Sequence, residues 1–99
     1  MTARWQEMLN SARVAFAVMT PDDPGASVEV RQARQNVIHE IGLCHARLGI
    51  FDTIVLIAHG VQEFSNIARV IHIPFCEGRL DEVEEKIKAC LIERGILEP

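Results

Sequence analysis

The sequence lacks an excess of positive charge, a long apolar run and a recognisable secretion signal. Ten Lys and Arg residues face fourteen Asp and Glu residues, which gives a net charge of -4 at pH 7. A protein that binds a nucleic-acid backbone needs a basic surface, so the composition disfavours this class. No apolar run approaches the ~20 residues of a membrane span, and the first residues lack the apolar region of a signal peptide. We therefore expect no nucleic-acid partner, no membrane partner and a cytoplasmic location.

Paired cysteines are also missing. Cys44, Cys76 and Cys90 are odd in number and show no Cys-x-x-Cys spacing, so neither a disulfide framework nor a zinc site is indicated. Cys44 and Cys90 fall on the apolar stripes of predicted helices, which favours buried thiols that pack as small hydrophobic groups.

The histidines lack the spacing of metal ligands. No Glu-x-x-His or His-x-x-x-His pattern joins them, and we expect no metal site. Two of them, His39 and His45, should lie on the outer face of a helix. His59 follows a predicted strand and is the histidine most suitably placed for a ligand.

The chain is long enough for one domain spanning residues 1–99, and 48% of its residues are apolar, which argues against disorder. Its apolar periodicity predicts alternating helices and strands. Helices are expected over the first dozen residues, at 30–48 and from Asp81 to Gly95; strands are expected at 14–20, 53–58 and 70–75. This order predicts an α/β fold with a parallel sheet and right-handed crossovers.

Three details accompany these elements. The run at 14–20 is uniformly apolar and reads as a strand buried on both faces. Pro74 marks the third strand as an edge strand or as its end. Asp81, followed three residues later by Glu84, is typical of a capping box that starts the last helix.

The helix at 30–48 organises the rest of the chain. At 100° per residue its apolar residues form one stripe, which should face the core. Glu40 lies about 60° to one side of this stripe, and Asn36 lies on the same flank one turn earlier. A polar pair at the border of a core is a candidate site, although Glu40 pairing with Arg47 or Arg34 on the helix surface is an alternative. The stripe consists of Val30, Ala33, Val37, Ile41, Cys44 and Leu48.

The run Ala33-Arg-Gln-Asn-Val-Ile-His-Glu-Ile-Gly42, with Thr20-Pro-Asp-Asp23 before it and Ser65-Asn-Ile-Ala-Arg-Val-Ile-His-Ile-Pro74 after it, resembles the bacterial TIR-like nucleotide-binding domains of anti-phage effectors. The resemblance covers roughly residues 5–95. It implies a flavodoxin-like parallel sheet with strand order 2-1-3-4-5, of which this chain would carry three strands flanked by helices. The family's first two strands and first helix would be absent. The strand at 14–20 would then be an edge that exposes Phe16 and Val18.

The resemblance also implies an activity. TIR-like domains cleave the nicotinamide-ribose bond of NAD+, and Glu40 matches their essential glutamate. A fixed carboxylate stabilises the oxocarbenium-like ribose of such a reaction. NAD+ is then a substrate, and no separate cofactor is expected. Because TIR-like sites are usually completed across protomers, the expected partners are a homo-oligomer or a chain that supplies the missing strands.

Other polar residues are candidates for substrate binding. Arg34, Gln35 and Asn36 are placed to orient a ribose or phosphate, although capping and surface contacts explain them equally well. Asp22, Asp23 and His59 follow two strands at the edge where open parallel sheets bind ligands. Turn formation is an alternative explanation for the two aspartates.

Three classes of function are compatible with an α/β fold of this kind. The first is an NAD+ glycohydrolase acting in defence, and the second is a non-catalytic module that binds a nucleotide or another protein. A redox or flavin protein is the third, and the absence of a phosphate-cradling glycine loop disfavours it.

Overall fold

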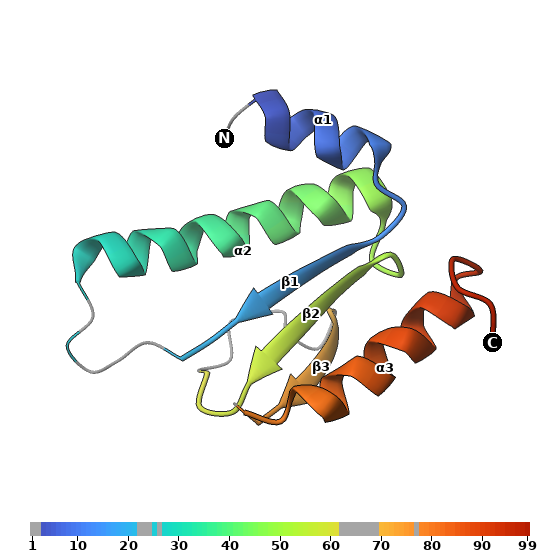
Figure 1. Cartoon of the computed structure of the whole chain (residues 1–99). Coiled ribbons are helices and arrows are strands. Elements are labelled where there is room, and N and C mark those ends of the chain that lie inside the picture. The colour runs from blue at the N-terminus through green and yellow to red at the C-terminus, as the bar shows by residue number, and fades with distance from the viewer. Residues whose placement is uncertain (1–2, 22–24, 26, 62–69, 77) are drawn as a thin grey trace.

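The computed structural model describes residues 3–21, 25, 27–61, 70–76 and 78–99. In this part of the chain the elements are α1 (Ala3–Ser11), β1 (Ala15–Met19), α2 (Val28–Leu48), β2 (Thr53–Ala58), β3 (Ile71–Phe75) and α3 (Leu80–Glu93). The strands form one parallel sheet in the order β1-β2-β3. Helices α1 and α2 lie on one face of the sheet and α3 lies on the other (Figure 1). This arrangement confirms the predicted α/β fold, with three strands flanked by helices.

Strand β2 is the centre of the fold, and all six of its residues are buried. After Thr53 its sequence is a continuous apolar run, which suits a strand covered on both faces. Val55 and Ile57 pack toward α2, whereas Ile54 and Leu56 pack toward α3. Both hydrophobic clusters found among the described residues therefore share this one strand.

Helix α2 packs against β1 and β2, and the described part of the predicted apolar stripe faces this contact; the side chains of Val30 and Ala33 lie outside the described residues. It begins two residues earlier than expected and ends at the expected residue, Leu48. Ile41 and Cys44 are buried, and Val37 packs at the border of the same cluster. Glu40 is half-buried beside them. The predicted position of this carboxylate, between core and surface, is confirmed.

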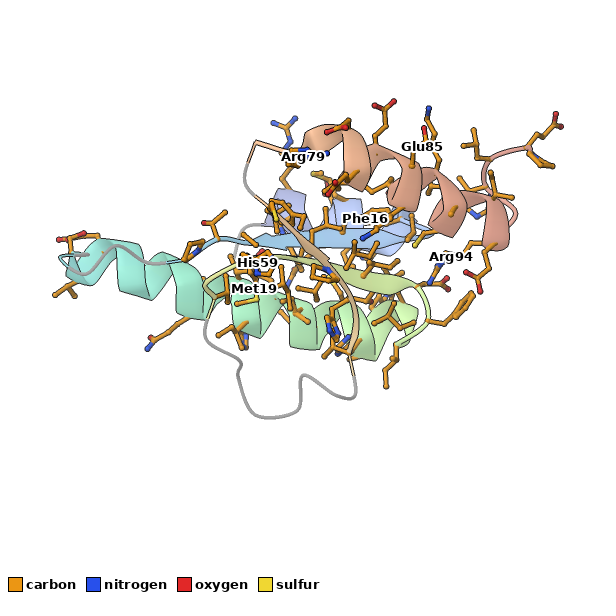
Figure 2. All side chains as sticks on the ribbon, turned by 90° about the horizontal axis from the view of Figure 1, so that it is seen from below. Phe16, Met19, His59, Arg79, Glu85 and Arg94 are labelled. Carbon is orange, nitrogen blue, oxygen red and sulfur yellow. The ribbon has the colours of Figure 1, made fainter. Side chains whose placement is uncertain are left out.

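Strand β1 is paired on one side only within the described residues, through its register with β2. Val18 is 54% exposed, and of the five residues of β1 only Met19 is buried. The prediction that this run is buried on both faces is therefore wrong. Its expected position at a sheet edge and the expected exposure of Val18 are confirmed, whereas Phe16 is half-buried against the cluster under α3. Figure 2 shows Phe16 on the α3 side of the sheet and Met19 on the α2 side, as strand alternation requires.

The first turn of α3 differs from the sequence prediction. The residue that precedes the helix is Arg79, whose side chain makes no capping hydrogen bond, so Asp81 does not form the expected capping box. Asp81 and Glu82 lie inside the first turn and pair with the Arg79 guanidinium, at 3.7 and 2.9 Å. Their carboxylates still favour this end of the helix dipole.

The carboxyl end of α3 agrees with the prediction. Gly95 has a φ of +71°, and the amides of Gly95 and Ile96 donate to the carbonyls of Ile92 and Leu91. These two bonds form a Schellman motif, in which glycine accepts the left-handed conformation without a steric cost.

Among the described residues, no helix has both the length and the apolarity that a bilayer-spanning segment needs.

Arg94 joins α3 to the loop before β2. Its side chain is 3% exposed, and its Nε donates to the Phe51 carbonyl at 2.9 Å while Nη1 donates to the Cys90 carbonyl at 2.9 Å. The guanidinium lies 4.1 Å from the centroid of the Phe51 ring and 3.5 Å from the Asp52 carboxylate. A buried guanidinium needs this set of acceptors to offset its desolvation. The contact fixes α3 against the start of the central strand.

The packing of α2 leads to a stability prediction. Ile41→Asp should lower the free energy of unfolding by roughly 3–5 kcal/mol, because it places an unpaired carboxylate against β1 and β2. Ile38→Asp, the same change on the same helix at a side chain that is 37% exposed, should cost far less. Urea denaturation followed by circular dichroism measures both. Equal midpoints for the two variants would contradict the assigned orientation of α2.

Candidate functional site

A groove lies between α1, α2 and the open side of β1, with a volume of about 420 Å³. We call it the Glu40 groove. Helix α1 packs mainly on α2 rather than on the sheet, and it forms one wall of the groove. Among the described lining residues Glu40 is the only charged one. They are Trp5, Met8, Leu9 and Ala12 of α1, Ala15, Phe16, Ala17 and Val18 of β1, Val37, Glu40, Ile41 and Cys44 of α2, and Thr53 of β2.

The sequence places Glu40 in this groove through the helical period. Residues 37, 41 and 44 contact the sheet, so position 40 is carried to the side of the helix that faces α1. No ion pair joins Glu40 and Arg47 among the described residues; Arg47 is exposed and lines a neighbouring cavity between α1 and α2. The alternative of a surface pair with Arg47 is therefore not what the structure shows.

Glu40 also lies close enough to Cys44 to affect its thiol. Burial raises the pKa of Cys44, and the negative charge of Glu40 raises this pKa further. Because the folded state holds the thiol proton more tightly than the unfolded state, Cys44 contributes stability at pH values below the unfolded thiol pKa of ~8.5. That contribution is lost as the pH rises through the higher pKa of the folded state.

His59 lies elsewhere, at the carboxyl ends of the strands. Its backbone amide donates to the Phe75 carbonyl at 2.9 Å, which joins the ends of β2 and β3. The next residue, Gly60, has a φ of +94°, and a Cβ there would lie 3.6 Å from the Pro21 side chain. The ends of β1, β2 and β3 are thus gathered at one edge of the sheet, where His59 is exposed (Figure 2).

A small pocket of about 160 Å³ is present at this strand edge. His59 and His72 both line it, together with Gly60, Val61 and Pro74 among others. The Nδ1 of His72 donates to the Val70 carbonyl at 3.1 Å, which fixes the orientation of the ring. None of the residues lining this pocket lines the Glu40 groove.

The remaining predicted site residues are only partly placed. Gln35 and Asn36 are exposed on α2, and neither lines the Glu40 groove or the pocket of His59. The side chain of Arg34, together with Asp22 and Asp23, lies outside the described residues. Glu40 lines the groove beside β1, whereas His59 lines the separate pocket at the strand ends. The described candidates therefore fall into two regions rather than one.

The structure places two residues differently from the sequence interpretation. Trp5, interpreted as a packing residue of the first helix, forms part of the wall of the Glu40 groove. His45, expected on the outer face of α2, is half-buried instead, and its Nε2 has no hydrogen-bond partner among the described residues. The signal for His45 is its spacing, because position 45 follows Ile41 by one turn and lies near the apolar stripe. The described residues contain no group of three or more metal-ligating side chains.

Comparison with protein families gives a match over most of the chain. A family model described as CAP12/Pycsar effector protein, TIR domain, matches residues 2–77. No curated protein and no solved structure matches the chain. The matched span contains the whole of α1, β1, α2, β2 and β3, and therefore the whole Glu40 groove and the strand ends.

The contact between Glu40 and Cys44 can be tested by thiol chemistry. Under native conditions iodoacetamide should modify the exposed Cys76 rapidly and Cys44 slowly, with a pH midpoint for Cys44 above the ordinary thiol range. Glu40→Gln should shift this midpoint to lower pH, since it removes the second of the two causes and leaves burial in place. Peptide mass spectrometry across a pH series measures each cysteine separately. An unchanged midpoint in the variant would contradict the proximity of the two side chains.

Proposed function

Because the chain belongs to the TIR domain family of CAP12/Pycsar anti-phage effectors, we propose that it is an NAD+ glycohydrolase domain in which Glu40 is the catalytic residue. The observation that carries this proposal is the setting of Glu40, which is half-buried and is the only charge among the described residues that line an apolar groove. A carboxylate in surroundings of low polarity acts more strongly on a nearby positive charge than one in water does. Partly enclosed carboxylates that line a groove are candidates for functional sites.

A fixed carboxylate is the main catalytic group that this reaction requires. The bond between the ribose C1′ and the nicotinamide nitrogen breaks, and its electron pair leaves with nicotinamide, which becomes neutral. The ribose carries the positive charge until a water molecule adds to C1′ and loses a proton to solvent. A fixed carboxylate stabilises the charge as it develops on the sugar, an effect on the order of 3 kcal/mol or about 100-fold in rate.

The other candidate residues are assigned to binding. In this proposal Gln35 and Asn36, which precede Glu40 on α2, hold ribose hydroxyls, and the Arg34 guanidinium binds the pyrophosphate. Asp22, Asp23 and His59 contact the more distant part of the nucleotide from the strand ends, where open parallel sheets collect ligands.

The proposed catalytic role is tested by one matched pair of variants. Glu40→Gln should lower nicotinamide release from NAD+ by about 100-fold or more, whereas Glu29→Gln, the same change in the first turn of α2, should leave it unaltered. Chromatography of nicotinamide over a series of protein concentrations measures this, because activity is expected to depend on assembly. Circular dichroism checks that both variants are folded. Turnover above background that is equal in wild type and Glu40→Gln would overturn the assignment.

A second candidate function, a protein-interaction module, is favoured by the edge of β1. The Ala15 amide donates to the Asp52 carbonyl at the start of β2, so the backbone groups of the alternate residues, Phe16 and Val18, point away from the sheet. The strand carries no charge and no proline that would block an added strand. We propose that this edge is covered in the assembled protein by another copy or by a partner chain that supplies further strands.

Size-exclusion chromatography with light scattering tests the edge directly. At low micromolar concentration the chain should elute as a species larger than its 11.1 kDa monomer. Val18→Lys should produce the monomer, because a charge on an edge strand opposes strand addition. Ile38→Lys, at an exposed apolar residue of α2, is the control and should behave as the wild type does. A sharp, folded monomer peak for the unaltered chain would exclude the interaction module.

A further inference from the structure

Strand β1 presents a hydrogen-bonding edge that is symmetric about its middle residue. The Ala15 amide donates to the Asp52 carbonyl, so the odd-numbered residues of the strand direct their backbone groups toward β2. The backbone groups of Phe16 and Val18 point the other way, where no strand lies among the described residues. These two residues stand on either side of Ala17, the third of the five residues of β1. The edge therefore carries two equivalent sets of one donor and one acceptor.

We infer that the partner of this edge is a second copy of β1, which runs antiparallel to the first across a twofold axis at Ala17. The inference deepens the proposed interaction module and rests on it. In this register Phe16 lies opposite Val18 of the partner subunit, and each such pair exchanges two backbone hydrogen bonds. Every outward-directed backbone group of Phe16 and Val18 is then paired. The product is a closed dimer in which the two three-stranded sheets become one continuous sheet.

The side chains on both faces of β1 suit this pairing. On the α3 face Phe16 meets Val18 of the partner subunit, and an aromatic side chain opposite a β-branched one is a favourable cross-strand pair. Val18, which is 54% exposed in the single chain, is covered by this contact. On the α2 face Ala17 meets its own copy, and this small side chain leaves room for α1, which lies beside the same edge.

Charge favours the antiparallel direction over the parallel one. β1 contains no charged residue, and the nearest charge in the sequence is the exposed Arg13. A parallel pair in register would place the two Arg13 side chains next to each other, and like charges directly opposite are destabilising. In the antiparallel register residue 13 falls opposite residue 21, so the two arginines are about 27 Å apart at 3.4 Å per residue. A copy of the strand therefore fits best when it runs in the opposite direction.

The other edge of the sheet explains why the pairing closes at two copies. β3 is the last strand on that side of the described sheet, and it contains Pro74, which has no backbone amide to donate. β1 contains neither proline nor charge. Strand addition is therefore favoured at one edge only. A twofold axis uses this edge in both copies, which gives a dimer rather than a filament.

Disulfide cross-linking tests the register. Residue 17 faces its own copy as a non-hydrogen-bonded pair with Cα atoms about 4.5 Å apart, which is within the range of a disulfide. Residue 15 lies opposite residue 19, so its two copies are roughly 14 Å apart, which is too far. Ala17→Cys and Ala15→Cys are thus a matched pair, since both alanines are half-buried and lie on the same face of one strand. Every variant also carries Cys76→Ser, which removes the exposed native thiol.

Mild oxidation at low micromolar concentration, followed by non-reducing electrophoresis, gives the rate at which each variant forms a covalent dimer. Ala17→Cys should cross-link about tenfold faster than Ala15→Cys or more. Adding Val18→Lys to Ala17→Cys should abolish this advantage, because a charge at the edge opposes strand pairing, whereas adding Ile38→Lys should preserve it. Circular dichroism checks that each variant is folded.

Amide hydrogen exchange gives an independent reading on the unaltered chain. The amides of Phe16 and Val18 should exchange slowly at high protein concentration and faster on dilution, because their partners belong to the second copy. The amides of Ala15 and Ala17 are directed toward β2 and should be protected at both concentrations. Exchange at Phe16 and Val18 that is independent of protein concentration would contradict the dimer.

The outcomes separate this inference from the functions on which it rests. A species larger than the monomer in which both cysteine variants cross-link equally, or neither does, would overturn the antiparallel register and leave the interaction module standing. A folded monomer of the unaltered chain at every concentration would overturn both. A dimer that cross-links through Ala17→Cys and releases no nicotinamide from NAD+ would refute the glycohydrolase and leave the dimer standing.

Discussion

The structure depends on the burial of one strand. Every residue of β2 is covered, and its side chains alternate between the cluster under α2 and the cluster under α3. The neighbouring strands complete both faces, because Met19 of β1 belongs to the cluster under α2 and Ile73 of β3 belongs to the cluster under α3. Arg94 attaches the end of α3 to the same strand, because its guanidinium donates to the Phe51 carbonyl just before β2 begins. Figure 1 shows the consequence as three layers, with the sheet in the middle.

The Glu40 groove is a result of the same architecture. Helix α2 covers β1 and β2 and turns the flank that carries Glu40 toward α1, while no strand lies beyond β1 in the described residues. The apolar side chains of the strand edge therefore become a wall of a cavity instead of part of a core. A carboxylate enclosed in this way acts on its neighbours: burial raises the pKa of the Cys44 thiol, and the charge of Glu40 raises this pKa further. The same property underlies the proposed catalysis.

Family membership and geometry support different parts of the functional argument. The match over residues 2–77 establishes a TIR domain of the anti-phage effector family, and it covers both candidate regions. The setting of Glu40 adds a physical reason for that residue to act on a positively charged substrate. The edge of β1 adds a reason for assembly, because outward-pointing backbone groups and the exposed Val18 favour an added strand. An effector whose activity depends on assembly would use both features together.

The sequence by itself determined the type and order of the elements and the flank of α2 that carries Glu40. These properties follow from local periodicity and from the family motif, which short stretches of chain encode. It did not determine that Asp81 pairs with Arg79 instead of capping α3, or that His45 is half-buried, because competing contacts decide such details. Only the tertiary structure decided that Trp5 and Glu40 line one groove while His59 lies at a separate edge. The reason is that the groove forms where α1 and α2 come together beside β1. The spacing of residues within one element does not determine how close that element lies to another.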